Sequence, residues 1–168
     1  MTNFQNARLF NLALRGFADK DVPNALVEFH QRATLGLLRR LIDKSPVGNP
    51  DLWKLTGYGL LRKGIKKRRT RGYVGGTFRG FWQAYANQDP LDGAQPPAKG
   101  ARPRTKGQAQ DAARSSIASL LPFSVSYVVN GMPYAERLNR GWSSQAPAGF
   151  VELTVAEEAN SLERSFQV

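Results

Sequence analysis

One long amphipathic segment constrains the fold of this chain more than any other feature. Its apolar residues recur at spacings of four and three, which places them along one side of an α-helix. They are Val22, Leu26, Phe29, Ala33, Leu37 and Leu41. Asp19 or Asp21 can cap the start of this helix, and Pro23 suits its first turn. Ser45-Pro46 then ends it, so we predict one long helix packed by a single face against the rest of the domain.

Two later segments have the alternation that is typical of strands. Residues 73–86 are rich in aromatic side chains, and residues 123–129 alternate apolar and polar side chains as in a half-buried strand. One predicted face of the first strand holds Phe78, Gly80, Trp82, Ala84 and Ala86. The apolar residues of the second strand are Phe123, Val125, Tyr127 and Val129. Gly75-Gly76 between strand-like residues indicates a bend or bulge.

Helical spacing returns at residues 108–121. The apolar side of this second helix comprises Ala109, Ala113, Ile117, Leu120 and Leu121. Thr154 and Glu157 have the spacing of a capping box, which predicts a short C-terminal helix. We therefore expect an α+β fold, in which an antiparallel sheet packs against the long N-terminal helix and the second helix.

The length of 168 residues fits a single domain over residues 1–168. Residues 1–18 lack a clean apolar period and predict either a short helix or an arm that docks on a neighbour. Two segments read as long mobile loops. Residues 54–72 are basic, and residues 89–106 are rich in Pro and Gly with little that could be buried.

The composition argues against several classes of chemistry. With no cysteine, the chain cannot form disulfides, thiolate metal sites or a cysteine nucleophile, and His30 is the only histidine. The sequence contains no Gly-x-Ser-x-Gly motif, no Walker loop and no carboxylate pair in an apolar context. It also lacks an apolar run of the roughly 20 residues that a membrane helix needs. Residues 1–6 have neither a charged start nor an uninterrupted apolar stretch, so we expect no signal peptide. We expect no enzymatic activity, no cofactor, no metal and no membrane association.

A strong positive charge is the other global feature. The net charge is +11, and seven cations lie within the ten residues 62–71. They are Arg62, Lys63, Lys66, Lys67, Arg68, Arg69 and Arg71. Such a segment is a solvated loop, a non-specific contact with DNA phosphates, or a contact with an acidic patch on a partner protein. The sequence leaves these three alternatives open.

The segment 133–151 holds almost nothing that can do chemistry, and its composition suits a surface that packs against another chain. It reads Pro-Tyr-Ala, then an acid, Gly141-Trp142, and Ser-Ser-Gln-Ala-Pro-Ala-Gly before Phe150. Earlier in the chain come Pro46-Val47 and Gly76-Thr-Phe-Arg79-Gly-Phe-Trp82. In this order, the motifs resemble those of bacteriophage tail-completion and neck proteins, the tail-component family that includes lambda minor tail protein Z. The sequence departs from the usual pattern at Asn139, where an acid is usual.

This resemblance implies a structural virion protein. It would form a neck or tail-completion ring that joins the head connector to the tail and surrounds the DNA channel, six-fold first and twelve-fold second. Its neighbours would be the head connector and the tail tube or terminator proteins, with synthesis in the cytoplasm of the host bacterium. The candidate interface residues are Trp142, Tyr134, Phe150, Arg79 and Trp82. Large aromatic side chains are the usual anchors of interfaces, although they serve domain cores equally well.

Two other functions fit the same sequence. The chain could be a basic protein that binds DNA or RNA, or a tail assembly factor that is absent from the finished particle. A ring-forming subunit should be oligomeric without nucleic acid, whereas a nucleic-acid-binding module should bind as a monomer with strong salt dependence.

Overall fold

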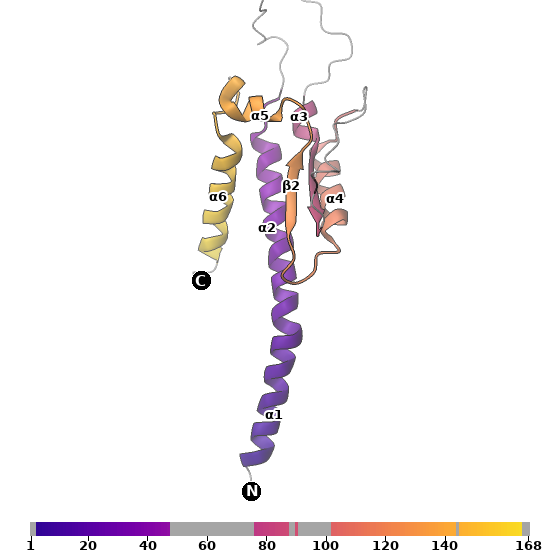
Figure 1. Ribbon diagram of the computed structural model, residues 1–168, viewed down its shortest axis with the longest axis vertical. Coiled ribbons are helices and arrows are strands. Elements are labelled where there is room, and N and C mark those ends of the chain that lie inside the picture. Colours follow the sequence, from indigo (N-terminus) through magenta and orange to yellow (C-terminus); the bar gives the residue numbers. More distant parts are fainter. Residues whose placement is uncertain (1–2, 48–75, 88–89, 91–101, 144, 166–168) are drawn as a thin grey trace, which may run out of the picture.

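A computed structural model describes residues 3–47, 76–87, 90, 102–143 and 145–165. Within these ranges the predicted α+β fold is confirmed, with a long N-terminal helix, a two-stranded antiparallel sheet and further helices (Figure 1). The N-terminal half contains α1 (Asn3–Gly16), η1 (Phe17–Asp21), α2 (Val22–Lys44), α3 (Thr77–Gly80) and β1 (Trp82–Ala86). The C-terminal half contains α4 (Lys106–Ile117), β2 (Ser126–Asn130), α5 (Ala135–Arg137), η4 (Leu138–Trp142) and α6 (Phe150–Ser165).

The predicted helix is longer than expected, because it continues through Pro23 toward the N-terminus. Neither aspartate caps it: Asp21 has helical backbone angles and makes no side-chain cap bond. Instead, η1 is a single π-helical turn in which the Val22 N–H donates to the Phe17 carbonyl. A proline inside a helix lacks an N–H and its ring crowds the preceding turn, and a wider turn relieves this conflict. As a result, α1, η1 and α2 form one rod, whose N-terminal part extends away from the body of the molecule (Figure 1).

The core lies where α2 and α4 pack against the sheet. β1 and β2 are antiparallel, and Trp82 pairs with Asn130 at one end of the register and Ala86 with Ser126 at the other. The core joins three residues of α2, two of β1, the small side chains of α4 and the aromatic rings of α3 and α6. These buried residues are Leu38, Leu41, Ile42, Phe78, Trp82, Ala84, Ala109, Ala113, Ile117, Leu120, Ala146 and Phe150.

The first predicted strand is shorter than expected. Its alternation is correct, since Phe78, Gly80, Trp82 and Ala84 are all buried, but Thr77–Gly80 forms the helical turn α3 and only Trp82–Ala86 is a strand. Gly76 precedes α3 with φ of 90°, a conformation that L side chains rarely adopt, as the predicted bend requires. Residues 73–75 lie outside the described residues.

The second predicted strand presents the opposite face to α2. Ser126 points to this helix, because its hydroxyl lies 2.7 Å from Thr34 Oγ1 and 2.9 Å from His30 Nε2. Val128 shares this face and packs against the core. Phe123 and Val125 precede β2 and are exposed, which contradicts the predicted apolar face. Polar side chains can occupy this inward face because they pair with each other there.

The second predicted helix begins and ends slightly earlier than expected. Thr105 caps α4 by accepting from the Gln108 N–H while the Gln108 side chain accepts from the Thr105 N–H. The helix ends at Ile117, so Leu121 lies beyond it and is exposed rather than buried. The predicted capping box at Thr154 is also wrong, because Thr154 lies inside α6 and its hydroxyl donates to the Phe150 carbonyl. Within the described ranges, no helix is both long and apolar enough to cross a bilayer.

Candidate subunit interface

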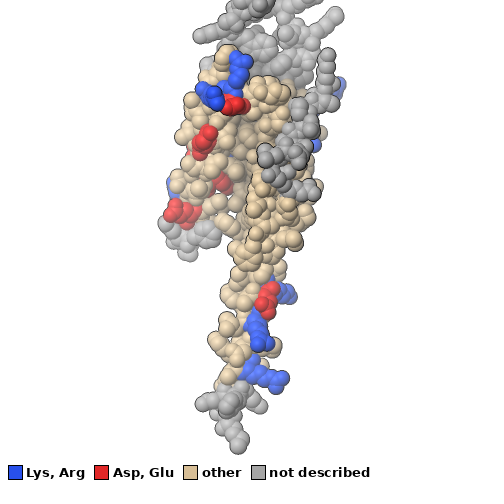
Figure 2. Space-filling model, in the orientation of Figure 1, with Lys and Arg blue, Asp and Glu red and all other residues tan. Residues whose placement is uncertain are grey.

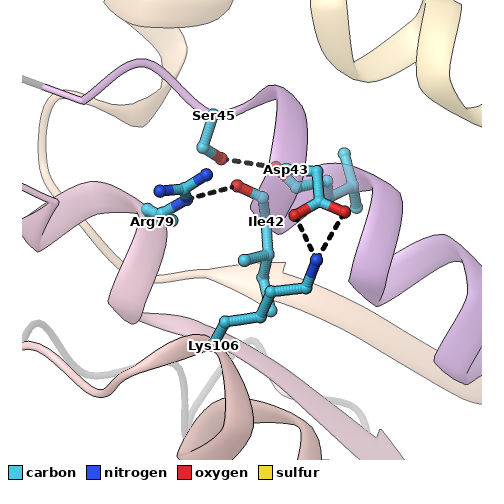
Figure 3. A network of polar contacts seen from close by, with 6 residues as sticks. Ile42, Asp43, Ser45, Arg79 and Lys106 are labelled. Carbon is cyan, nitrogen blue, oxygen red and sulfur yellow. Dashed lines mark hydrogen bonds and ion pairs between the residues drawn. The ribbon is translucent and has the colours of Figure 1, made fainter.

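Three of the five predicted interface residues lie inside the domain. Phe150 and Trp82 are buried in the core, where both rings contact Phe78 with centroid separations of 6.2 and 5.7 Å. Arg79 lies between α3 and the end of α2, and its Nε donates to the Ile42 carbonyl at 2.9 Å (Figure 3). A cation near a helix C-terminus satisfies a free carbonyl and interacts favourably with the helix dipole. These three residues therefore hold the fold together.

Several hydrogen bonds and an ion pair meet at the C-terminus of α2. Ser45 donates to the Leu41 carbonyl at 2.6 Å and accepts from Trp82 Nε1 at 2.7 Å. On the other side of the helix, Lys106 pairs with both carboxylate oxygens of Asp43 at 2.5 and 2.7 Å (Figure 3). These contacts fix α3, β1 and α4 around one helix end. They all join residues of the same domain, which indicates a structural role for this site.

Trp142 is different, because its side chain remains 72% exposed. The Arg137 guanidinium carbon lies 3.6 Å from the centre of the Trp142 ring, close enough for a cation–π contact. The ring sits on η4 beside Gly141, whose φ is 85°. Tyr134, at the start of this segment, is partly exposed and its ring lies 6.1 Å from that of Phe78. Trp142 is thus the most exposed of the predicted interface candidates.

Asn139 holds the Trp142 segment against α6. Its Nδ2 donates to both carboxylate oxygens of Glu152, at 2.8 and 2.9 Å, and its Oδ1 accepts from the Val151 N–H at 3.0 Å. The side chain therefore supplies the N-terminal cap of α6 from outside the helix. The amide lowers the pKa of the Glu152 carboxyl, and a backbone hydrogen bond of Glu152 lowers it further. Asn139 thus binds the Glu152 carboxylate through an uncharged side chain.

The N-terminal residues, which the sequence predicts to be a short helix or an arm that docks on a neighbour, form a helix with an exposed apolar surface. Every described side chain from Asn6 to Asp21 is exposed, including several large apolar ones. They are Leu9, Phe10, Leu12, Leu14 and Phe17. Leu9, Ala13 and Phe17 recur every four residues, a spacing that places them on one side of a helix. We call α1 and η1, residues 3–21, the arm.

A second exposed apolar group lies in the connection between α4 and β2. It consists of Leu121, Phe123 and Val125. Phe123 is 83% exposed and has φ of 61°, a left-handed conformation that is uncommon for a bulky residue. The fold thus holds an aromatic side chain outward at some cost in backbone strain, an arrangement that tends to mark functional sites.

Charge is distributed unevenly over the described surface. α6 carries four glutamates and one arginine, whereas α1 carries two arginines and no acid. Figure 2 shows acidic side chains gathered over α6, and mostly basic ones along the projecting part of the arm. The predicted basic segment from Arg62 to Arg71 lies outside the described residues, as does most of the Pro/Gly-rich segment 89–106.

Among the residues that the structure describes, no group of three or more acidic or histidine side chains could hold a metal ion. His30 is engaged with Ser126 between α2 and β2. Comparisons of this chain with protein-family models, with curated proteins and with solved structures found no match.

Proposed function

We propose that this protein is a structural subunit of a tailed-bacteriophage virion. In this proposal it forms a neck or tail-completion ring that joins the head connector to the tail and surrounds the DNA channel. The motifs of segments 46–82 and 133–149 support the phage assignment by resemblance. The role is assembly rather than catalysis.

The observation that carries the proposal is the exposed apolar surface of the arm. Phe10 on α1 is 66% exposed, and its large apolar neighbours are also in water. A monomeric soluble protein rarely leaves a contiguous apolar helix face uncovered, and such surfaces mark sites of protein–protein contact. A projecting helix of this kind suits a subunit that must grip a neighbour.

The oligomeric state of the purified protein tests this proposal. Native mass spectrometry and negative-stain electron microscopy, without nucleic acid, should show closed rings, with six-fold symmetry expected first. A nuclease-treated sample that stays monomeric up to about 100 µM would contradict the proposal.

The net charge of +11 also supports a second candidate function, in which the protein is a basic nucleic-acid-binding module. A monomer that binds random duplex with strong salt dependence would favour this alternative. The assembly-factor alternative differs only in that the protein should be absent from purified particles.

A further inference from the structure

We propose that Asn130–Gly131 is a latent deamidation site, which the native fold keeps unreactive and which unfolding makes reactive. This inference goes beyond the proposed function and does not depend on it, because it concerns the chemistry of a single chain. It assigns a modification site to the end of the sheet and a fate to chains that stay unfolded.

The sequence makes Asn130 the asparagine most prone to deamidation. Of the nine asparagines in the chain, Asn130 is the one that a glycine follows. In deamidation the backbone nitrogen of the following residue attacks the side-chain amide carbon, and glycine hinders this attack least because it has no Cβ atom. Gly131 also lets an unfolded chain reach the turned backbone conformation that the attack needs.

The reaction consumes water and needs no other co-reactant. The Gly131 nitrogen forms a bond to Asn130 Cγ and gives up its proton, and the side-chain nitrogen leaves with that proton as ammonia. The product of this step is a succinimide ring. Water then opens the ring at either of its carbonyl groups, which gives aspartate or isoaspartate without oxidation or reduction.

The folded structure holds Asn130 in a geometry that opposes this attack. Asn130 is the last residue of β2 and pairs with Trp82 of β1, so its backbone is extended. Its side-chain amide is bonded at both ends, because Nδ2 donates to the Phe78 carbonyl at 2.8 Å and Oδ1 accepts from the Met132 N–H at 3.2 Å. To close the succinimide ring, Asn130 would have to leave the sheet and give up both hydrogen bonds.

These contacts connect Asn130 to the core. Phe78 and Trp82 are both buried, and their rings pack edge to face. Freeing Asn130 therefore means opening the end of the sheet where α3 meets β1, rather than fraying an exposed loop. The rate of deamidation should thus follow the fraction of molecules in which this part of the core is open.

The product cannot restore the contact that the amide makes. An ionised aspartate has no N–H to donate, and here its carboxylate would face the Phe78 carbonyl oxygen. Isoaspartate also routes the backbone through the side-chain carbons. A chain that reacts while unfolded should therefore refold to a less stable state, which makes the modification a lasting mark of earlier unfolding.

Peptide mapping of the full-length protein tests the site. Trypsin cleavage after Arg114 and Arg137 releases residues 115–137, in which Asn130 is the only side-chain amide, so any conversion of amide to acid in this peptide occurs at Asn130. The protein is first incubated at mildly alkaline pH, either folded or unfolded in guanidinium chloride. We expect aspartate and isoaspartate in the unfolded sample, and a rate at least about 100-fold lower in the folded one, because open molecules are rare in a stable fold.

Variants separate the chemistry from the fold. Gly131→Ala, compared with the wild type in the unfolded state, should react more slowly because a Cβ atom hinders the attack. Asn130→Asp reproduces the aspartate product and should lower the folding equilibrium constant at neutral pH by at least about tenfold. Asn11→Asp is the matched control, since it adds the same charge at an exposed position of α1 and should leave stability unchanged.

Each contrary result overturns a stated part of the proposal. A folded protein that reacts as fast as the unfolded one would show that the contacts of Asn130 with Phe78 and Met132 give no protection. An unfolded Gly131→Ala chain that reacts as fast as the wild type would overturn the attack by the Gly131 nitrogen. Wild-type stability of Asn130→Asp would overturn the loss of stability on refolding.

Discussion

Asn139 ties the Trp142 segment to the first turn of α6 through hydrogen bonds to Glu152 and Val151. The amide lowers the pKa of Glu152, so this interaction stabilises the fold above the pH range in which the unfolded carboxyl titrates. The stabilisation is lost as the pH falls through the lowered pKa of the folded state. Asn139→Asp removes the donor and sets a carboxylate beside Glu152. We expect the pKa of Glu152 to rise and stability at pH 7 to fall.

NMR titration of Glu152 and chemical denaturation at pH 7 and pH 4 would check this prediction. The difference in stability between Asn139→Asp and the wild type should shrink at pH 4, where the carboxyls become protonated. Asn139→Ala is the matched control, because it removes the same hydrogen bonds without adding a charge and should show the weaker pH dependence. An unchanged pKa of Glu152 in both variants would show that the amide contact has no electrostatic effect.

Trp142 and Phe150 are both interface candidates from the sequence, but their substitutions should have opposite effects on folding stability and on assembly. Trp142 is largely exposed, so Trp142→Ala should change the free energy of unfolding by less than about 0.5 kcal/mol. If its ring anchors a subunit contact, the same change should weaken assembly by about 2 kcal/mol or more, roughly 30-fold. Phe150→Ala should instead destabilise the folded monomer by about 3–5 kcal/mol. Thermal denaturation and sedimentation velocity of both variants separate the two effects.

Sequence patterns predicted the helices and strands whose formation depends on the burial of apolar side chains. The alternation through Phe78 to Ala84 and the small apolar side of α4 follow from burial, which leaves a periodic record in the sequence. The helix at 22–41 is also present, but its buried residues are Thr34, Leu38, Leu41 and Ile42, so of the predicted apolar stripe only Leu41 is buried. β2 was assigned the wrong face because Ser126 finds partners on α2 that cannot be seen in a local pattern. Pro23 was taken as a helix start because a π turn that accommodates a proline has no sequence signature.

The candidate interface was predicted less well than the fold. Aromatic side chains at positions 82, 142 and 150 look alike in the sequence, and only their places in the fold separate Trp142 from the two buried rings. The sequence predicted residues 1–18 as a short helix or a docking arm, but it did not predict that α1 continues through η1 into α2. An apolar helix face that binds another protein has the same periodicity as one that is buried within the domain, so the sequence could not distinguish the two.

The packing of α6 on α2 depends on a nearly buried carboxylate. Glu158 lies over Gly36, where a Cβ atom would overlap its side chain, and it pairs with Arg40. Arg40→Ala leaves this carboxylate without its cation and should cost about 2 kcal/mol of unfolding free energy. Lys44→Ala is the matched control, because its partner Glu157 is far more exposed and its loss should cost less than about 0.5 kcal/mol. Urea denaturation of both variants tests the difference, and equal losses would contradict it.

For the whole molecule, the net charge of +11 is the property that the proposed ring would have to accommodate. Subunits with this charge repel each other, so a ring needs local attraction where they touch. Seven of the cations lie in the segment 62–71. Whether the protein contacts DNA depends on whether this segment binds DNA phosphates or another protein.

Neutralising Lys66, Lys67, Arg68 and Arg69 together to Gln distinguishes the partners of that segment. Each lost phosphate contact lowers the slope of log affinity against log salt by about one, so four DNA contacts would flatten it by about four. We expect the slope on random duplex to change by less than about one. A subunit around a DNA channel must let the genome slide, and tight binding of phosphates would oppose this movement.

If the segment instead contacts an acidic neighbouring protein, the variant should be released from virions while its DNA affinity stays unchanged. A salt titration of the purified variant, with the wild type and the unrelated change Arg102→Gln as controls, decides the matter, and a strongly flattened slope would assign the segment to DNA.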